Sequence, residues 1–239
     1  MTYELYYWPE IQGRGEFVRL ALEQAGADYV DVARQEGDDL PGLMHYMQDG
    51  AVPQPPFAPP YLKAGDLLIG QTANILLFLG DRHGLAPSDE AGRLWTHQLQ
   101  LTIADLVVEV HDTHHPIGSG LYYEDQKPEA KRRAADFLAH RLPKFLGYFE
   151  QVMARNPAGD THLVGDTVTT ADLSMFQMIA GLCYAFPKAM AKVERNHPRL
   201  VALHDLVAAL PRVKAYLASP RRIPFNPMGI FRHYPELDA

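Results

Sequence analysis

With 239 residues, 47% of them hydrophobic, the chain is long enough for one large or two modest domains and has the composition of an ordinary soluble globular protein. No apolar run reaches the length of a membrane span, and a net charge of −7 without a long basic run argues against a membrane or a nucleic acid as partner. The single cysteine, Cys183, excludes an internal disulfide and a cysteine-rich metal site.

The first 84 residues alternate between strand and helix patterns. Aromatic or apolar runs predict strands at 3–8, 28–33, 57–62 and 66–70, and 3.6-residue periodicity predicts helices at 15–25, 40–48 and 71–84. Because a helix connects the first two strands, we expect them to be parallel, with a hairpin around Ala64 and Gly65 later. The start, MTYELYYWPE, lacks the pattern of a signal peptide, which favours a cytoplasmic location.

Beyond residue 84 the pattern becomes helical. A linker at 85–90 precedes helices predicted at 91–115, 128–153, 168–186 and 198–217, the last as one or two helices. Pro143 should kink or divide its helix, and Thr169 with Asp172 forms a capping-box start signal. The tail from Pro220 is expected to wrap over the surface. The chain therefore divides into an α/β domain at 1–84 and an all-helical domain at 91–239.

The helix at 71–84 begins with Gln71 and Thr72, after five prolines between residues 53 and 60. A helix N-terminus presents free N–H groups and a positive dipole, which favour a carboxylate or phosphate. The alternative is that Thr72 only caps the helix. The prolines suit a stiff surface loop or a polyproline ligand, or else a cis peptide before Pro60, although only about 5% of X–Pro bonds are cis.

Tyr7 lies at the predicted end of the first strand and is followed by Trp8 and Pro9. Strand ends are where ligands bind in α/β domains, and a phenol there can hydrogen-bond an anion. Packing in the core is the alternative role for this tyrosine.

These signals, in this order, resemble the cytosolic glutathione transferases of the tyrosine type over essentially the whole chain. The matching segments are YYWPEIQGRGEFVRLAL, PPYL, IGQTANIL and VTTADL. The resemblance implies a thioredoxin-like N-terminal domain that binds glutathione and an all-α C-terminal domain that forms most of the second-substrate pocket.

The resemblance also assigns roles to individual residues. Tyr7 would stabilise the glutathione thiolate with Arg14 nearby, and Pro60 would be the cis residue. The backbone of Pro59 would hold the cysteinyl amide, and Gln71 with Thr72 the γ-glutamyl carboxylate.

Two departures from the family pattern affect the site. One extra residue between Tyr7 and Gly13 makes Tyr6 an alternative thiol partner; we prefer Tyr7, since neighbouring strand side chains point to opposite faces. The segment 34–54 lacks the usual Trp and Lys that hold the glycine carboxylate, and His45 and Gln48 are the substitutes.

His111, His114 and His115 stand at i, i+3 and i+4 and are expected to share one helix face. The resemblance implies that they line the second-substrate pocket with Trp8 and Tyr122, since this helix flanks that pocket in the family. A metal site is the alternative, for which a suitable further ligand is lacking. Asp105 resembles the residue that reaches the glutathione ammonium across a dimer interface; a solvated or helix-paired carboxylate is the alternative. Cys183 is expected to be inert packing.

The predicted function is conjugation of glutathione, a cosubstrate, to small apolar electrophiles by a homodimer without a metal. The alternatives are a glutathione-dependent isomerase or peroxidase using the same site, and a non-catalytic ligand-binding module.

Overall fold

The structure, a computed structural model, describes residues 1–35 and 40–238. Four strands form one mixed sheet in the order β2-β1-β3-β4. Their bounds are β1 Tyr3–Tyr6, β2 Tyr29–Asp31, β3 Tyr61–Ala64 and β4 Leu67–Gly70. The predicted parallel pairing of β1 with β2 is confirmed, and β3 runs antiparallel to both β1 and β4.

Helices cover both faces of the sheet. Their bounds are α1 Gly15–Ala25, α2 Leu40–Gln48 and α3 Thr72–His83. Leu5 and Leu62 pack with α1 and α3 in the main core, whereas Tyr6 and Tyr61 pack with Leu43 of α2 in a separate cluster. This is the alternation that a strand imposes on its side chains. The predicted thioredoxin-like arrangement of this part is confirmed.

The first two strands are shorter than predicted. β1 ends at Tyr6, so Tyr7 lies just beyond the ladder, and β2 gives way to a 3₁₀ turn at Val32–Arg34. The apolar runs continue past these points because Tyr7, Val32 and Ala33 stay buried after the ladder hydrogen bonds end.

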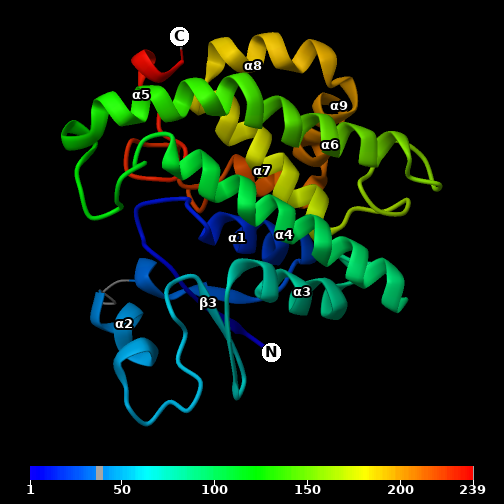
Figure 1. Ribbon diagram of the computed structural model, residues 1–239. Helices are drawn as coiled ribbons and strands as arrows, with labels where there is room; N and C mark the ends of the chain where they lie inside the picture. The colour runs from blue at the N-terminus through cyan, green and yellow to red at the C-terminus, as the bar shows by residue number, and fades with distance from the viewer. Residues whose placement is uncertain (36–39, 239) are drawn as a thin grey trace.

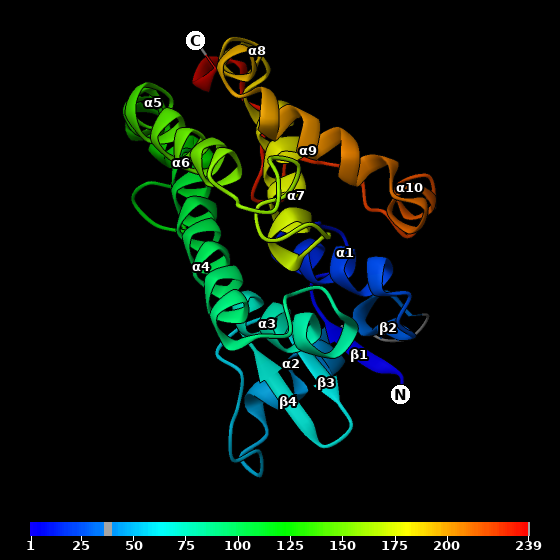
Figure 2. The same ribbon diagram turned by 90° about the vertical axis from the view of Figure 1, so that its right-hand side faces the viewer.

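The remainder of the described chain is helical, as predicted (Figure 1). The helices are α4 Glu90–Asp112, α5 Lys127–Asp136, α6 Leu142–Ala154, α7 Thr170–Ala185, α8 Pro187–Val193, α9 Pro198–Ala209 and α10 Pro211–Leu217. α7 is the central helix and packs against α4, α9 and α1 (Figure 2). The predicted capping box at its start is confirmed: the Asp172 carboxylate accepts from the Thr169 N–H at 2.7 Å and from the Leu163 N–H at 2.8 Å.

Pro143 divides the helix predicted at 128–153, as expected. α5 and α6 are separated by a π-helical turn at Phe137–Arg141. Proline lacks an N–H, and its ring crowds the carbonyl four residues earlier, so the wider turn just before it accommodates the ring.

The C-terminal tail runs back over the molecule and ends beside α5 and α8 (Figure 1). Asn226 donates to the carbonyl of Glu10 at 2.8 Å, and the Phe231 ring covers Gly181. The Asp238 carboxylate accepts from N–H groups in the first turn of α8 at 2.8 and 3.0 Å. The tail thus fastens the loop after β1 to the helical part. Over residues 1–35 and 40–238, no helix is both long and apolar enough to cross a lipid bilayer.

Candidate functional site

Tyr7 packs against the start of α1. Its side chain is 4% exposed, and its hydroxyl accepts a hydrogen bond from the Arg14 N–H at 2.8 Å. A Cβ on Gly13 would come within 2.0 Å of this hydroxyl, and one on Gly15 within 2.4 Å of the ring, so both glycines are needed for the close approach. In the described part of the chain, no hydrogen bond uses the proton of the Tyr7 hydroxyl. The phenol is therefore held in place, almost fully buried, and its proton has no acceptor among the described residues.

Tyr6 points to the opposite face of the sheet. Its hydroxyl donates to the Glu4 carboxylate at 2.6 Å, and its ring stacks on Tyr61 with the centroids 4.6 Å apart. Burial raises the pKa of the Tyr6 phenol, and the Glu4 carboxylate raises it further. The proton of this hydroxyl is thus already in use within the protein.

A buried ionic network lies beneath Tyr7. The Arg19 guanidinium carbon is 5.7 Å from the centroid of the Tyr7 ring and pairs with Asp31 at 2.6 Å and Glu16 at 3.3 Å. Glu16 in turn pairs with Arg222 of the tail. Burial raises the pKa of the Tyr7 phenol, while the Arg14 N–H and the cations of Arg14 and Arg19 oppose the shift. The phenol therefore stays protonated near neutral pH.

The start of α3 has no side-chain cap, contrary to the alternative in which Thr72 caps the helix. Gln71 occupies the N-cap position with φ 68°, a value that non-glycine residues rarely adopt, and no side chain caps this helix. Thr72 is the first helical residue, and its hydroxyl oxygen is buried without a hydrogen-bond partner. The interpretation of Thr72 as a cap is therefore wrong, because its hydroxyl is one position too late to do so. The first N–H groups of α3 stay available.

The Pro59–Pro60 peptide bond is cis, and β3 begins at the next residue. The cis proline implied by the family resemblance is thus present, and the purely trans loop is excluded.

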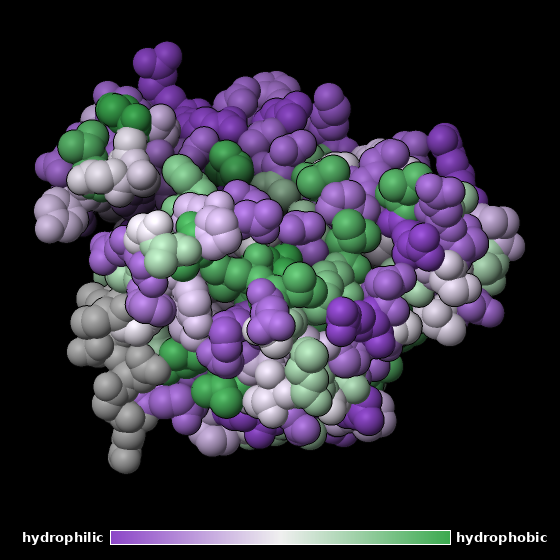
Figure 3. All heavy atoms as spheres, turned by 90° about the horizontal axis from the view of Figure 1, so that it is seen from below, coloured by the Kyte–Doolittle hydropathy of each residue, from purple (hydrophilic) through white to green (hydrophobic). Residues whose placement is uncertain are grey.

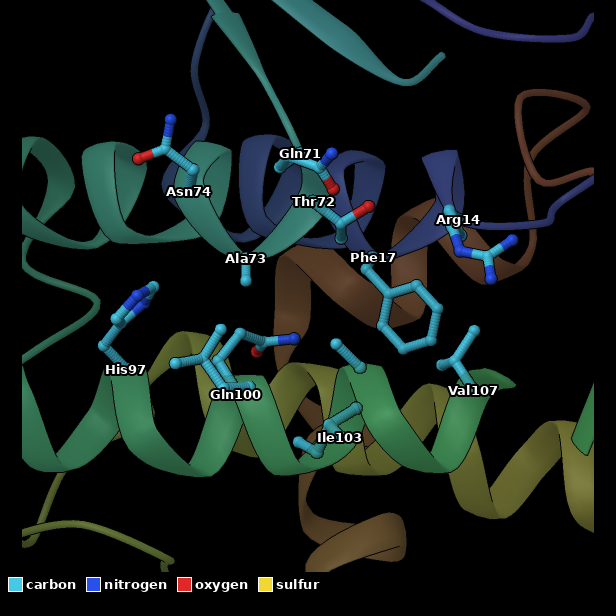
Figure 4. Close-up of a pocket in the computed structure, with 12 residues that line it drawn as sticks. Arg14, Phe17, Gln71, Thr72, Ala73, Asn74, His97, Gln100, Ile103 and Val107 are labelled. Atoms are coloured by element: carbon cyan, nitrogen blue, oxygen red, sulfur yellow. The ribbon is translucent and has the colours of Figure 1, made fainter. Parts of the chain in front are cut away.

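A cavity of about 250 Å³ lies between the starts of α1 and α3 and the inner face of α4 (Figure 4). Arg14, Gln71 and Thr72 line one side, and no ion pair within the described residues neutralises the Arg14 guanidinium. His97 and Gln100 face them from α4. The remaining lining residues are Phe17, Ala73, Asn74, Leu101, Ile103, Ala104 and Val107.

Several buried polar atoms of this cavity lack a partner. They are the Thr72 Oγ1, the His97 Nδ1 and the Gln100 Oε1 atoms, three of the seven such side-chain atoms among the described residues. Buried polar groups in native proteins are nearly always hydrogen-bonded to protein or to water, so these three atoms call for a polar partner, either water or a ligand, within the cavity. His97 and Gln100 were not predicted. The signal available was a glutamine inside the buried stripe of the 91–115 helix, next to Leu99.

The three histidines form a cluster at the end of α4. Their ring centroids lie 4.7 to 5.5 Å apart. α4 ends at Asp112, three residues before the predicted end, since the residue preceding Pro116 disfavours helical geometry. His111 is therefore on the helix, and His114 and His115 follow it.

Burial of His114 decides the charge of its imidazole. Its Nε2 donates to the carbonyl of Ile230 at 2.8 Å, and its Nδ1 contacts the Nδ1 of His115. Burial lowers the pKa of His114 to about 3 and also lowers that of His115, and the nearby Arg232 cation adds to both effects. Both imidazoles are neutral at pH 7. Among the described residues, no group of three or more His, Cys, Asp or Glu side chains is arranged to hold a metal ion.

The other predicted site residues lie outside the cavity. His45 and Gln48 are exposed on α2, and Trp8 is partly exposed after β1. Tyr122 is 79% exposed. Asp105 is exposed on α4 and makes no ion pair with the described residues, so the helix-paired alternative is wrong. Cys183 is half-buried in α7, where burial raises the pKa of its thiol to about 12, in agreement with inert packing.

Comparison with known proteins adds a family match. Residues 111–220 match the family model "Glutathione S-transferase, C-terminal domain". The "Glutathione S-transferase P" of Bos taurus is 29% identical over 241 residues, which span 95% of this chain and 98% of that protein. The "Glutathione S-transferase" of Plasmodium yoelii yoelii is 24% identical and spans 87% and 90%.

A solved structure, the pi-class glutathione S-transferase of Onchocerca volvulus, superposes with a TM-score of 0.70 at 22% identity, covering 91% of this chain and 92% of that one. At this identity the superposition supports the same fold for both parts of the chain.

Proposed function

Since the chain belongs to the glutathione transferase family, we propose that it binds glutathione and transfers the thiolate to small apolar electrophiles. The observation that carries this proposal is the Tyr7 hydroxyl, which accepts from Arg14 and keeps its own proton free. The uncapped start of α3 lies beside the same segment, and both border one cavity through Arg14 and Thr72.

The γ-glutamyl carboxylate would bind at the start of α3. The N–H groups of the first turn and the Thr72 hydroxyl are free to donate, and the helix dipole favours a negative charge there. The Gln71 side chain and the Arg14 cation border the same space.

The thiol would lie against the Tyr7 hydroxyl. A free cysteine thiol has a pKa of about 8.5, so most of it is protonated at neutral pH. A hydrogen bond from Tyr7 stabilises the thiolate selectively, and each unit of lowered pKa corresponds to about 1.4 kcal/mol. Because the Tyr7 phenol stays protonated, it remains a donor throughout the neutral range.

The remainder of the tripeptide would extend toward the sheet edge. We assign the cysteinyl backbone to Pro59 and the glycine carboxylate to His45 and Gln48, which are exposed on α2. His45 and Gln48 of α2, and Pro59 in the loop before β3, do not line the cavity proposed for the γ-glutamyl end.

The electrophile would bind between the loop after β1 and the end of α4. Trp8 and Tyr122 supply aromatic surface, and His114 and His115 supply neutral imidazoles. His111 lies one turn beyond Val107 on α4, and His114 follows the end of that helix, so this pocket would continue from the cavity that Val107 lines.

The protein would act as a homodimer through α4. Leu94, Leu101 and Val108 are exposed on α4 at seven-residue spacing, which places them in one stripe, with Asp105 beside it. Phe57 is 92% exposed in the loop before β3. Hydrophobic side chains also gather in the middle of the lower face of the molecule (Figure 3). Sedimentation equilibrium tests this assembly, and a monomer at micromolar concentration would refute it.

A panel of reactions with glutathione tests the function itself: conjugation of an aryl halide, reduction of an organic hydroperoxide and cis–trans isomerisation. We expect conjugation to be the fastest. If one of the other reactions is fastest, the proposed glutathione site stands but the proposed reaction is wrong. If glutathione binds without any turnover, the protein is a non-catalytic binding module.

A further inference from the structure

We propose that Gln100, assisted by His97, binds the α-ammonium group at the γ-glutamyl end of glutathione within the same protein chain. This inference rests on the proposed binding of glutathione. With Gln100 on one wall and the start of α3 on the other, the cavity would select a group that carries both charges of an α-amino acid.

Gln100 is built into the cavity wall. Its side chain is only 3% exposed, and its Oε1 atom has no hydrogen-bond partner. His97 precedes it by three residues, so the two side chains project from one face of α4. The Nδ1 atom of His97 is likewise buried and unpaired. Figure 4 shows both side chains opposite Thr72 and Gln71 across the cavity.

The chemistry of the two walls differs. The α3 wall offers N–H groups, a hydroxyl and the Arg14 cation, which suit a carboxylate. An amide oxygen only accepts, so a carboxylate cannot satisfy the Gln100 Oε1 atom, whereas an ammonium N–H can. The cavity thus has a wall for a negative group and an acceptor for a positive one. Burying this acceptor without a partner is costly in the free protein, and ligand binding removes that cost.

Asp105 is the alternative residue for binding the ammonium group. It is exposed on the outer face of α4, so it can act only on a ligand of another subunit, whereas Gln100 faces its own chain's cavity. The two residues therefore make separable predictions.

The test is the Gln100→Leu variant, which keeps the approximate size of the side chain and removes the acceptor. Gln98→Leu is the matched control, because Gln98 is exposed on the same helix. Calorimetry should give a Kd for glutathione raised about 10-fold or more by Gln100→Leu, since the lost bond is to a charged donor. The Kd of glutaryl-cysteinyl-glycine, which lacks the ammonium, should be nearly unchanged.

Two further measurements test whether weaker binding by Gln100→Leu could result from damage to the fold. The Tm of unliganded Gln100→Leu should equal or exceed that of the wild type, because an unpaired buried oxygen has been removed. Gln98→Leu, which changes an exposed residue of the same helix, should bind both tripeptides about as well as the wild type.

The outcomes separate the two proposals. Wild-type protein that binds neither tripeptide would refute the proposed function. If the wild type binds glutathione and Gln100→Leu binds it with the same Kd, only the role of Gln100 is overturned. The same holds if Gln100→Leu raises the Kd values of both tripeptides equally. Loss of ammonium selectivity in Asp105→Asn but not in Gln100→Leu would assign that role to Asp105.

Discussion

Replacement of Tyr7 by phenylalanine removes one hydroxyl and leaves the ring in its slot against Gly13 and Gly15. A hydrogen bond to a charged group contributes about 1.5 to 3 kcal/mol. At 1.36 kcal/mol per unit, the pKa of the bound glutathione thiol should rise by about 1 to 2 units. The variant should still bind glutathione, because the carboxylate contacts at α3 are untouched. It should also lose about 1 to 3 kcal/mol of stability, since the Arg14 N–H loses its acceptor.

The assay is the ultraviolet absorbance of the bound thiolate as a function of pH. Tyr6→Phe is the control, because the Tyr6 hydroxyl is occupied by Glu4 on the other face of the sheet. An unchanged thiol pKa in Tyr7→Phe, together with a raised one in Tyr6→Phe, would refute the assignment of Tyr7.

Three other perturbations test separate parts of the account. Thr72→Val should weaken glutathione binding measured by calorimetry without lowering the Tm of the free protein, because the hydroxyl has no partner there; a lower Tm with normal binding would contradict this. Asp172→Ala should reduce the free energy of unfolding in urea by about 3 kcal/mol or more, since it removes buried bonds to Thr169 and Leu163, and a loss below about 1 kcal/mol would contradict it. His114 has a folded pKa of about 3, below its ordinary value near 6.5, so the unfolded state binds more protons between these values and stability falls as pH drops through that window. His114→Gln should therefore flatten the stability profile from pH 6.5 toward pH 4 by up to about 1.4 kcal/mol per unit, and an unchanged profile in urea titrations would refute this.

Local chemistry explains why some elements could be predicted from the sequence. α1 was predicted with the bounds that the structure has, because Gly26 ends it in the left-handed conformation that glycine adopts readily. The start of α7 was predicted from Thr169 and Asp172 for the same reason: both partners of its cap lie within four residues.

Elements that depend on tertiary packing were predicted less well. The end of β1 at Tyr6 and the short helix α8 were not anticipated, since their limits depend on neighbouring elements. The cis bond before Pro60 followed from the resemblance and not from the residues, whose pattern also fits a trans loop.

The candidate site shows the same division. Tyr7, Gln71 and Thr72 were proposed from the sequence because they mark a strand end and a helix start, and Gln71 and Thr72 do line the cavity. Gln100 and His97 were missed because their significance arises only when α4 packs across the start of α3, which leaves their polar atoms unpaired. The buried pair of Arg19 with Asp31 likewise joins α1 to β2, which no local pattern connects, whereas Glu16 lies only three residues before Arg19 on the same helix.

A crystal structure of the protein with glutathione tests most directly whether the tripeptide binds at the start of α3 and at Tyr7. We expect the γ-glutamyl carboxylate on the first N–H groups of α3 and the sulfur within hydrogen-bond distance of the Tyr7 hydroxyl. A tripeptide bound elsewhere, or a sulfur that lies away from Tyr7, would contradict it.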